Sequence, residues 1–355
     1  MRSCNCNDGY IMQMQNFSVN DGDGIRTTIF LYGCPLHCIW CCNPENAYCP
    51  GMGMSSQDSL TNIMPEIRAD HQTEAAGDGR GIMPHTEAAQ EMHHMTLDEV
   101  DKKISRQALF YRGNGGGITF SGGEATVQQG FLRAMVNRFY DKGYDLSLET
   151  CGAFSFDEVK DILQKMSRIF MDLKLFDDRL HRLFTGVSNA VILKNIRRTA
   201  ALQVPVVVRI PVIVGVNAFE ENIEATCAFL EDVQESCSAG SSMADGQESG
   251  PADISLEFLP YHRYGMDKYT KLGIPDPDAR YEMLREQAGI RWENSQAEQQ
   301  MESRPGSGAL QGMKDVGSFP GGFSFAQRME IPSEKLLERY REIADAHHIR
   351  TVSFH

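Results

Sequence analysis

The sequence predicts an α/β protein built on a parallel sheet, because six apolar runs typical of buried strands alternate with helical patterns. The runs lie at Ile25–Tyr32, Gly117–Phe120, Tyr144–Glu149, Ile169–Leu175, Val204–Val214 and Ile254–Leu259. The helical patterns lie at Leu97–Leu109, Val127–Tyr140, Phe156–Met166, Asn189–Leu202 and Phe219–Val233. This alternation makes parallel strands joined by right-handed crossovers, in an open sheet or a barrel. Six strands are too few for a complete eight-stranded barrel.

Composition limits the function classes. The 355 residues are 41% hydrophobic and carry a formal net charge of −14, which argues against binding to nucleic acid or to anionic membranes. No apolar run reaches the roughly 18 residues of a membrane span, and the amino terminus lacks a signal-peptide stretch. We therefore expect a cytoplasmic protein, in which clustered cysteines bind metal more often than they form disulfides.

Three stretches differ from a packed domain. Residues 50–95, 237–252 and 295–328 are rich in Gly, Ser, Gln and acidic residues and show no sustained periodicity. We interpret them as low-complexity loop insertions in one domain that covers residues 1–355. The core of that domain is then about 15–49, 96–236, 253–294 and 329–355.

The cysteines Cys34, Cys38 and Cys41 form a C-x3-C-x2-C pattern directly after the first strand. Structural zinc sites use four protein ligands, and ordinary iron–sulfur clusters are held by four cysteines. Three thiolates on a four-iron cluster leave one iron open to a small molecule, which indicates chemistry. The flanking residues argue against a chance grouping. Cys151 is better interpreted as a small buried apolar residue than as a ligand.

Unusual polar residues follow the other strands, at the carboxyl edge where ligands bind in parallel sheets. After the second strand, Ser121–Glu124 reads SGGE, whose paired glycines allow close backbone approach to a ligand; a plain β–α turn is the alternative. Glu149 and Thr150 end the third strand and suit a hydroxyl group or a hard cation.

Two further groups complete this edge. Asp172 and Lys174 share one face of the fourth strand, where the lysine suits a carboxylate, although a surface ion pair fits equally well. Arg209 lies mid-strand and must meet a carboxylate or a carbonyl, since an unpaired buried guanidinium is costly. His262, beyond the sixth strand, suits an anionic ligand group, although a lone histidine is more often structural.

Together these segments resemble the radical S-adenosylmethionine (SAM) enzymes, specifically the glycyl-radical-enzyme activating proteins, of which pyruvate formate-lyase activating enzyme is the best known. The resemblance runs in order through NDGDGIRTTIFLYGCPLHCIWCCNPEN, ITFSGGEATVQQGF, LSLETCG, FMDLKLFDDRLHRLFTGVSN, VVVRIPVIVGVNAFEEN and LEFLPYHRYGMDKYTKLG. It implies a partial (β/α)6 TIM-like barrel of the radical SAM type.

The resemblance also implies roles. Cys34, Cys38 and Cys41 would bind one [4Fe–4S] cluster whose open iron takes SAM. Around SAM, the resemblance places Trp40 beside the adenine and Asn43 facing the nucleoside. It places Gly122, Gly123 and Glu124 at the methionine amino group, and Lys174 and His262 at the methionine carboxylate. Glu149, Thr150 and Asp172 would lie near a monovalent cation and the SAM ribose or methionine. Arg209 is implied to help place the target peptide, and Asp23 and Arg26 to lie by the substrate entrance.

The implied reaction is reductive cleavage of SAM to a 5′-deoxyadenosyl radical, which abstracts hydrogen from a glycine Cα of a partner glycyl radical enzyme. A flavodoxin or ferredoxin would supply the electron to a monomeric activase. A radical SAM enzyme acting on a small molecule or RNA is the first alternative. A zinc or electron-transfer module, which needs a fourth ligand, is the second.

The chain departs from the family pattern at several positions. GGEA and DGDG each lack the usual proline, and Cys42 stands where the family tends to have Ser or His. Many relatives carry two further clusters in an insert with about eight cysteines, whereas residues 50–95 contain none. We therefore predict a single cluster. The pair Cys4 and Cys6 reads as part of a disordered terminus, and Cys49 stands isolated.

Overall fold

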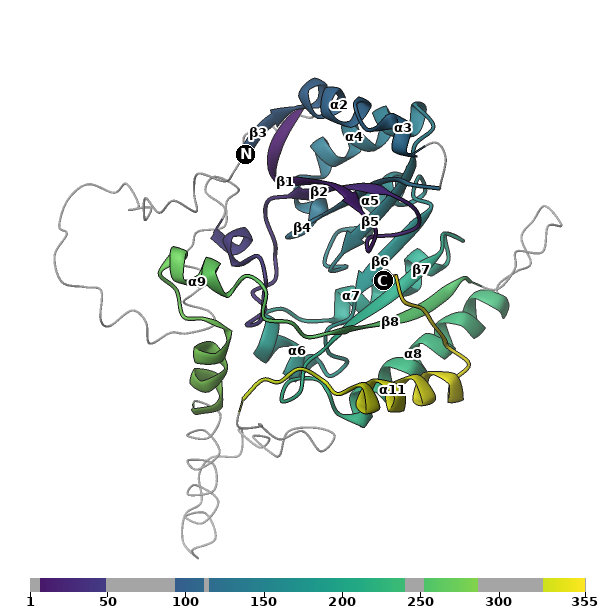
Figure 1. The fold of residues 1–355 in the computed structure, drawn as a ribbon. Helices are drawn as coiled ribbons and strands as arrows, with labels where there is room; N and C mark the ends of the chain where they lie inside the picture. The colour runs from purple at the N-terminus through teal and green to yellow at the C-terminus, as the bar shows by residue number, and fades with distance from the viewer. Residues whose placement is uncertain (1–6, 49–92, 112–114, 240–251, 287–327, 355) are drawn as a thin grey trace, which may run out of the picture.

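The computed structural model describes residues 7–48, 93–111, 115–239, 252–286 and 328–354. These segments form one nine-stranded sheet in the order β3-β1-β2-β4-β5-β6-β7-β8-β9 (Figure 1). The strands are β1 Asp8–Ser18, β2 Arg26–Leu31, β3 His93–Thr96, β4 Gly117–Gly122, β5 Asp145–Thr150, β6 Arg168–Asp172, β7 Val206–Val212, β8 Ile254–Pro260 and β9 Arg350–Thr351.

The helices connect successive strands. They are α2 Leu97–Ser105, α3 Ala108–Tyr111, α4 Gln129–Asp141, α5 Phe156–Leu163, α6 Asp178–Thr185, α7 Ala190–Ala200, α8 Glu220–Ala239, α9 Met266–Leu272 and α11 Glu334–Ala346, with short 3₁₀ helices η1 Pro44–Tyr48 and η4 Ala125–Gln128. Residues 277–286 are also helical. Neighbouring helices α2, α4, α5, α7, α8 and α11 contact one another in that order along the sheet (Figure 1).

The six predicted strands are confirmed as β2, β4, β5, β6, β7 and β8, which are parallel and adjacent in chain order. The fold is therefore α/β with six parallel strands, as expected for a partial barrel. Within the described residues the two edge strands, β3 and β9, do not pair with each other, so the sheet stays open.

The two faces of the parallel strands differ in chemistry. Residues such as Ile29, Phe120 and Met171 point outward into the core beneath the helices and are fully buried. Full burial of one such side chain contributes about 1.5–3 kcal/mol. Because side chains alternate along a strand, the intervening positions face the inside of the sheet, and many of them are polar, including Glu149 and Arg209. The interior therefore holds charged groups that the outer core excludes.

Several elements were not expected. The antiparallel strand β1 lies between β3 and β2 and begins at residue 8, before the predicted core start at 15. The predicted insertion 50–95 ends in β3, which pairs with β1, and the predicted insertion 237–252 begins inside α8. The predicted helix at 97–109 is divided into α2 and α3. Residues 49–92, residues 287–327, Cys4, Cys6 and Cys49 lie outside the described residues.

Candidate functional site

The three cysteines lie in the cysteine loop, which we define as residues 33–46, at the carboxyl end of β2. Their side chains pack in one cluster with Leu36, Trp40, Ala153, Val187 and a further thiol, Cys151. Cys38 is buried, Cys34 and Cys41 are half-buried, and Cys42 is exposed. The three cysteines thus lie together, which agrees with the expectation from their spacing in the sequence.

Burial makes the bare thiols reluctant to ionise. It raises the pKa of Cys38 to about 12, against the lowering effect of the Lys174 ammonium. Burial also raises the pKa of Cys41 well above its usual range, and the neighbouring thiols of Cys42, Cys38 and Cys34 act in the same direction. A bound cation would be needed to hold these groups as thiolates, and iron supplies that charge. The donor set therefore fits an iron–sulfur cluster.

No three His, Cys, Asp or Glu side chains among the described residues are arranged to hold a single metal ion. A four-iron cluster binds each thiolate through a different iron, so its ligands need not meet at one point. None of the seven described cysteines forms a disulfide.

The end of helix α6 supports the cysteine loop. The backbone N–H of His37 donates to Thr185 O at 2.8 Å, and that of Ile39 donates to Phe184 O at 3.1 Å. The ring of Trp40 lies 6.5 Å from the ring of Phe184, centre to centre. The TGVSN block in the sequence thus provides the surface on which the cysteine loop rests.

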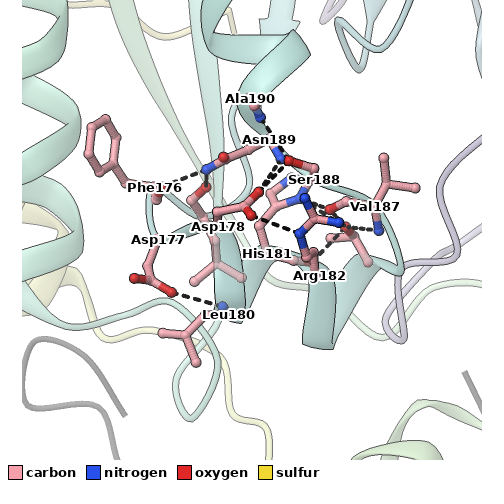
Figure 2. Close-up of polar contacts among 12 residues, drawn as sticks. Phe176, Asp177, Asp178, Leu180, His181, Arg182, Val187, Ser188, Asn189 and Ala190 are labelled. Atoms are coloured by element: carbon pink, nitrogen blue, oxygen red, sulfur yellow. Dashed lines mark hydrogen bonds and ion pairs between the residues drawn. The ribbon is translucent and has the colours of Figure 1, made fainter. Parts of the chain in front are cut away.

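Figure 2 shows the polar contacts that fix this support. Asp178 accepts from Ser188 Oγ at 2.5 Å and from the Asn189 N–H at 3.0 Å. The Asn189 amide donates to Leu175 O at 3.0 Å, which joins the start of α7 to the end of β6. The Nδ1 atom of His181 forms a hydrogen bond of 2.6 Å with Val187 O, which accepts it. These contacts make the loop between α6 and α7 a rigid platform.

The predicted SAM glycines lie directly against the cysteine loop. The Gly123 N–H donates to Leu31 O at 3.1 Å, and the Glu124 N–H donates to Gly33 O at 2.7 Å. A Cβ at Gly123 would lie 2.5 Å from Gly33 O, and Gly122 has φ +127°. Only glycine fits this close approach, which is to the chain's own backbone.

Glu124 and Thr150 join two strand ends. The Glu124 carboxylate is buried and accepts from Thr150 Oγ1 at 2.8 Å and from the Cys151 N–H at 2.7 Å. It also accepts from the N–H and the hydroxyl of Thr126 at 3.0 and 2.6 Å. Both side chains are engaged within the protein, so contact between either of them and SAM stays a prediction.

Asp172 and Lys174 form an ion pair of 2.8 Å on the inner face, as the strand alternation predicts. Burial alone lowers the pKa of Lys174, but the charges of Asp172 and Cys38 outweigh it, so the pKa is raised. The lysine therefore stays protonated beside the cysteine cluster, where it can form an ion pair with the carboxylate of a ligand.

Arg209 meets carboxylates, as expected for a buried guanidinium. It donates to Glu149 at 2.6 Å and to Glu257 at 2.7 Å, and it also donates to the backbone of Asn20 at 3.3 Å. Its guanidinium carbon lies 3.8 Å from the centre of the Phe170 ring. Glu257 was missed, although a charged residue between apolar neighbours in LEFLP carries the same signal that identified Arg209.

Glu149 is committed to this network rather than open to a cation. It accepts from Ser121 Oγ at 2.5 Å as well as from Arg209. Burial raises its pKa, although the Arg209 charge lowers it. Its assignment near a monovalent cation stays a prediction.

The remaining predicted residues are spread more widely. His262 is exposed in the loop after β8, where its Nδ1 accepts from the Tyr264 N–H at 3.3 Å. Arg26 is buried and pairs with Asp145 at 2.9 Å, and Asp23 pairs with Arg168 at 2.6 Å. These last pairs lie at the amino ends of β2, β5 and β6, whereas the cysteine loop follows the carboxyl end of β2.

Sequence reasoning also missed residues around the cysteine loop. Lys268 of α9 donates to Asn43 Oδ1 at 2.6 Å and to Glu45 Oε1 at 2.7 Å. Within the described part of the chain, Glu45 Oε2 and Asn46 Oδ1 are buried without a hydrogen-bond partner. Such orphaned acceptors fit a ligand that donates hydrogen bonds, as the SAM ammonium does.

Comparison with known proteins agrees with this geometry. Residues 28–230 match the model of the Radical SAM superfamily. Isethionate sulfite-lyase activating enzyme of Nitratidesulfovibrio vulgaris is 32% identical over 76% of this chain and 89% of its own length. Trans-4-hydroxy-L-proline dehydratase activating enzyme of Clostridioides difficile is 29% identical over 74% of this chain and 87% of its own length. A solved domain of pyruvate-formate lyase-activating enzyme from Bacteroides vulgatus is 24% identical over 67% of this chain and 98% of that domain, with a TM-score of 0.41.

The chain belongs to the radical SAM superfamily. Within the superfamily it is an activating enzyme of glycyl radical enzymes. The family implies a [4Fe–4S] cluster and SAM as cofactors and a glycyl radical enzyme as partner. Among the described residues, no helix combines the length and apolar character needed to cross a membrane.

Proposed function

We propose that Cys34, Cys38 and Cys41 hold a single [4Fe–4S] cluster with one open iron, and that SAM binds there between the cysteine loop and the strand ends. The observation that carries this proposal is the packing of the three thiols in one buried cluster. Their loop is hydrogen-bonded to the turn Gly122–Glu124, which we call the GGE turn. Cys151 lies in the same group, but we assign it no iron, which keeps one iron free for SAM.

The chain's own residues have distinct tasks in this proposal. Gly122 and Gly123 bring the end of β4 against the loop, so that backbone groups reach the methionine end of SAM. Lys174, held protonated by Asp172, attracts the SAM carboxylate. Trp40 and Asn43 face the adenosine. His262 would join them from the loop after β8.

When bound and reduced, the cluster supplies the electron that splits SAM into methionine and a 5′-deoxyadenosyl radical. The protein orients the ribose C5′ toward the target glycine and excludes competing reactions. The inner-face pair of Arg209 and Glu149 shapes the interior of the open sheet, where the glycine loop of the partner would enter. Glu149, Thr150 and Asp172 would hold a monovalent cation only if Glu149 exchanged one of its present partners.

The relatives are named for activating different lyases, dehydratases and decarboxylases at similar identity, and this similarity favours no single target. We propose a partner of the glycyl radical class, a flavodoxin or ferredoxin as electron donor, and a monomeric activase in the cytoplasm.

We further propose that residues 50–95 contribute no cluster ligand. Replacement of residues 52–92 by a Gly-Ser linker should leave the iron content unchanged, because this stretch contains no cysteine. Iron lost on this replacement would contradict the single-cluster organisation.

The test of function is electron paramagnetic resonance (EPR) of a candidate partner, beginning with isethionate sulfite-lyase. The reduced activase and SAM should produce a glycyl radical signal in the partner, and Cys38→Ala should produce none. SAM cleavage without a radical in any glycyl radical enzyme tested, together with modification of a small molecule or RNA, would contradict the proposed target class.

A further inference from the structure

Helix α9 also contacts the cysteine loop. The Tyr269 hydroxyl donates to Cys41 O at 2.6 Å, and the tyrosine side chain is almost fully buried. The Lys268 ammonium bridges Asn43 Oδ1 at 2.6 Å and Glu45 Oε1 at 2.7 Å. Two neighbouring residues of one helix thus fix three successive parts of the loop.

The start of the helix fits the same surface. Gly265, directly before α9, has φ +84°, and a Cβ there would lie 2.5 Å from Cys42 O. A side chain at this position would therefore push the helix away from the loop. The close packing indicates that α9 is held against the cysteines rather than placed near them incidentally.

These contacts surround the residue that carries one thiol, Cys41. Tyr269 holds the Cys41 carbonyl, and Lys268 holds the side chains of Asn43 and Glu45, so together they fix the backbone that carries the Cys41 thiol. Hydrogen bonds to the ligating sulfurs and nearby charge set the reduction potential of an iron–sulfur cluster.

We propose that Lys268 and Tyr269 are positioning residues that raise the reduction potential of the cluster, Tyr269 by fixing the Cys41 backbone and Lys268 by holding its ammonium group beside the cysteine loop. Reduction adds negative charge to the cluster. An ammonium group held near the cluster stabilises that charge and therefore raises the potential. The inference rests on the proposed assignment of Cys41 as a cluster ligand.

The helix offers a matched control. Lys271 lies one turn from Lys268 and pairs only with Asp267, at 3.6 Å, among the contacts described for the chain. Both members of that pair are more than half exposed. Lys271→Met therefore removes the same charge from the same helix without touching the cysteine loop. Lys268→Arg keeps the charge and tests rescue.

The experiment is an EPR-monitored redox titration of the anaerobically reconstituted full chain. We expect Lys268→Met to bind the cluster, to be reduced at a lower potential than wild type, and to lose iron to a chelator about tenfold faster, as is typical when the partner of a metal ligand is removed. Lys271→Met should match wild type, and Lys268→Arg should recover most of the potential. Tyr269→Phe should show faster iron loss with an unchanged circular dichroism spectrum.

The outcomes separate the inference from its premise. A wild-type protein that binds no cluster would overturn the cysteine assignment and the inference with it. Normal iron content in Lys268→Met with an unchanged potential and EPR spectrum would overturn the inference alone. Should Lys268→Met fail to fold, an unchanged rate of iron loss and an unchanged potential in Tyr269→Phe would overturn it.

Discussion

The guanidinium of Arg209 in β7 and the carboxylate of Glu149 in β5 form an ion pair of 2.6 Å across β6, on the inner face of the sheet. Arg209 also pairs with Glu257 at 2.7 Å. Both charged partners in this second pair are buried, with side chains 8% and 1% exposed. The arginine therefore places one buried cation between two carboxylates on the inner face of the sheet.

Removal of Arg209 should be costly. Arg209→Met leaves Glu149 and Glu257 without their cation, and we expect a loss of about 3–5 kcal/mol in the free energy of unfolding, as for other broken buried pairs. Urea unfolding measures it. The control Arg341→Met removes an exposed pair with Glu334 and should cost about 1 kcal/mol or less. Equal effects of the two substitutions would contradict the role assigned to the inner-face network.

The GGE turn predicts a difference between two glycines. Gly123→Ala places a methyl group 2.5 Å from Gly33 O and 2.8 Å from Asn46 Cβ, so it should displace the cysteine loop and weaken SAM binding about tenfold or more. Gly143→Ala meets open space at φ +74° and should cost only about 1–2 kcal/mol of stability. Equilibrium binding of SAM to the reconstituted proteins separates the two, and equal affinities would show that the turn tolerates a side chain.

The cysteine group predicts unequal roles for neighbouring thiols. Cys38→Ala should prevent assembly of the cluster, because it removes one of three ligands. Cys151→Ala should keep about four irons per chain, as expected for a non-ligand. Iron analysis and the absorbance of the reconstituted proteins report both. If Cys151→Ala also loses the cluster, the site has a fourth protein ligand and no open iron.

His347 predicts a pH dependence of stability. Its ring bridges Glu231 and Glu224 at 2.9 Å each, and the hydrogen bonds to these carboxylates raise the pKa of His347. The folded state therefore binds this proton more tightly than the unfolded state, whose His pKa is about 6.5. The stabilisation is fully present below that value and is lost as the pH rises through the raised pKa.

We expect the contribution to be about 1 kcal/mol or less, because Glu224 is half exposed. Cys227 beside the two carboxylates does not interfere, since burial raises its pKa to about 12. Urea unfolding between roughly pH 6 and pH 9 should show a slope that His347→Gln removes. A slope that persists in the variant would assign the effect to other groups.

Strand periodicity predicted much of the architecture. The apolar runs that became β2 and β4–β8 are buried on the helix-facing side, so their pattern carries the fold directly. Strand β1, which lies between β3 and β2, escaped notice because many of its residues are polar or partly exposed. Helix α6 spans only eight residues, and its boundaries depend on the Asp177 cap and on Gly186 in the left-handed conformation, which are local contacts rather than periodic signals.

The candidate site also contains residues that the sequence predicted and residues that it did not. Arg209 interrupts an apolar strand, and this signal predicted that it would meet a carboxylate or a carbonyl on the inner face, which it does. Strand alternation placed Asp172 and Lys174 on one face but left a surface ion pair equally likely, and the structure places their pair on the inner face. Lys268 and Tyr269 could not be placed from sequence, because their partners lie more than 200 residues away in the cysteine loop. Their contacts depend on how the segment after β8 folds back, and no local pattern encodes that path.

The most direct test of the central claim is cleavage of SAM by the anaerobically reconstituted protein under dithionite. The claim is that three cysteines hold a cluster with one iron open to SAM. It predicts that wild type and Cys151→Ala release 5′-deoxyadenosine and methionine, measured by chromatography, and that Cys38→Ala releases neither. A wild-type protein with a full cluster and no 5′-deoxyadenosine, or equal cleavage by Cys38→Ala, would contradict the claim.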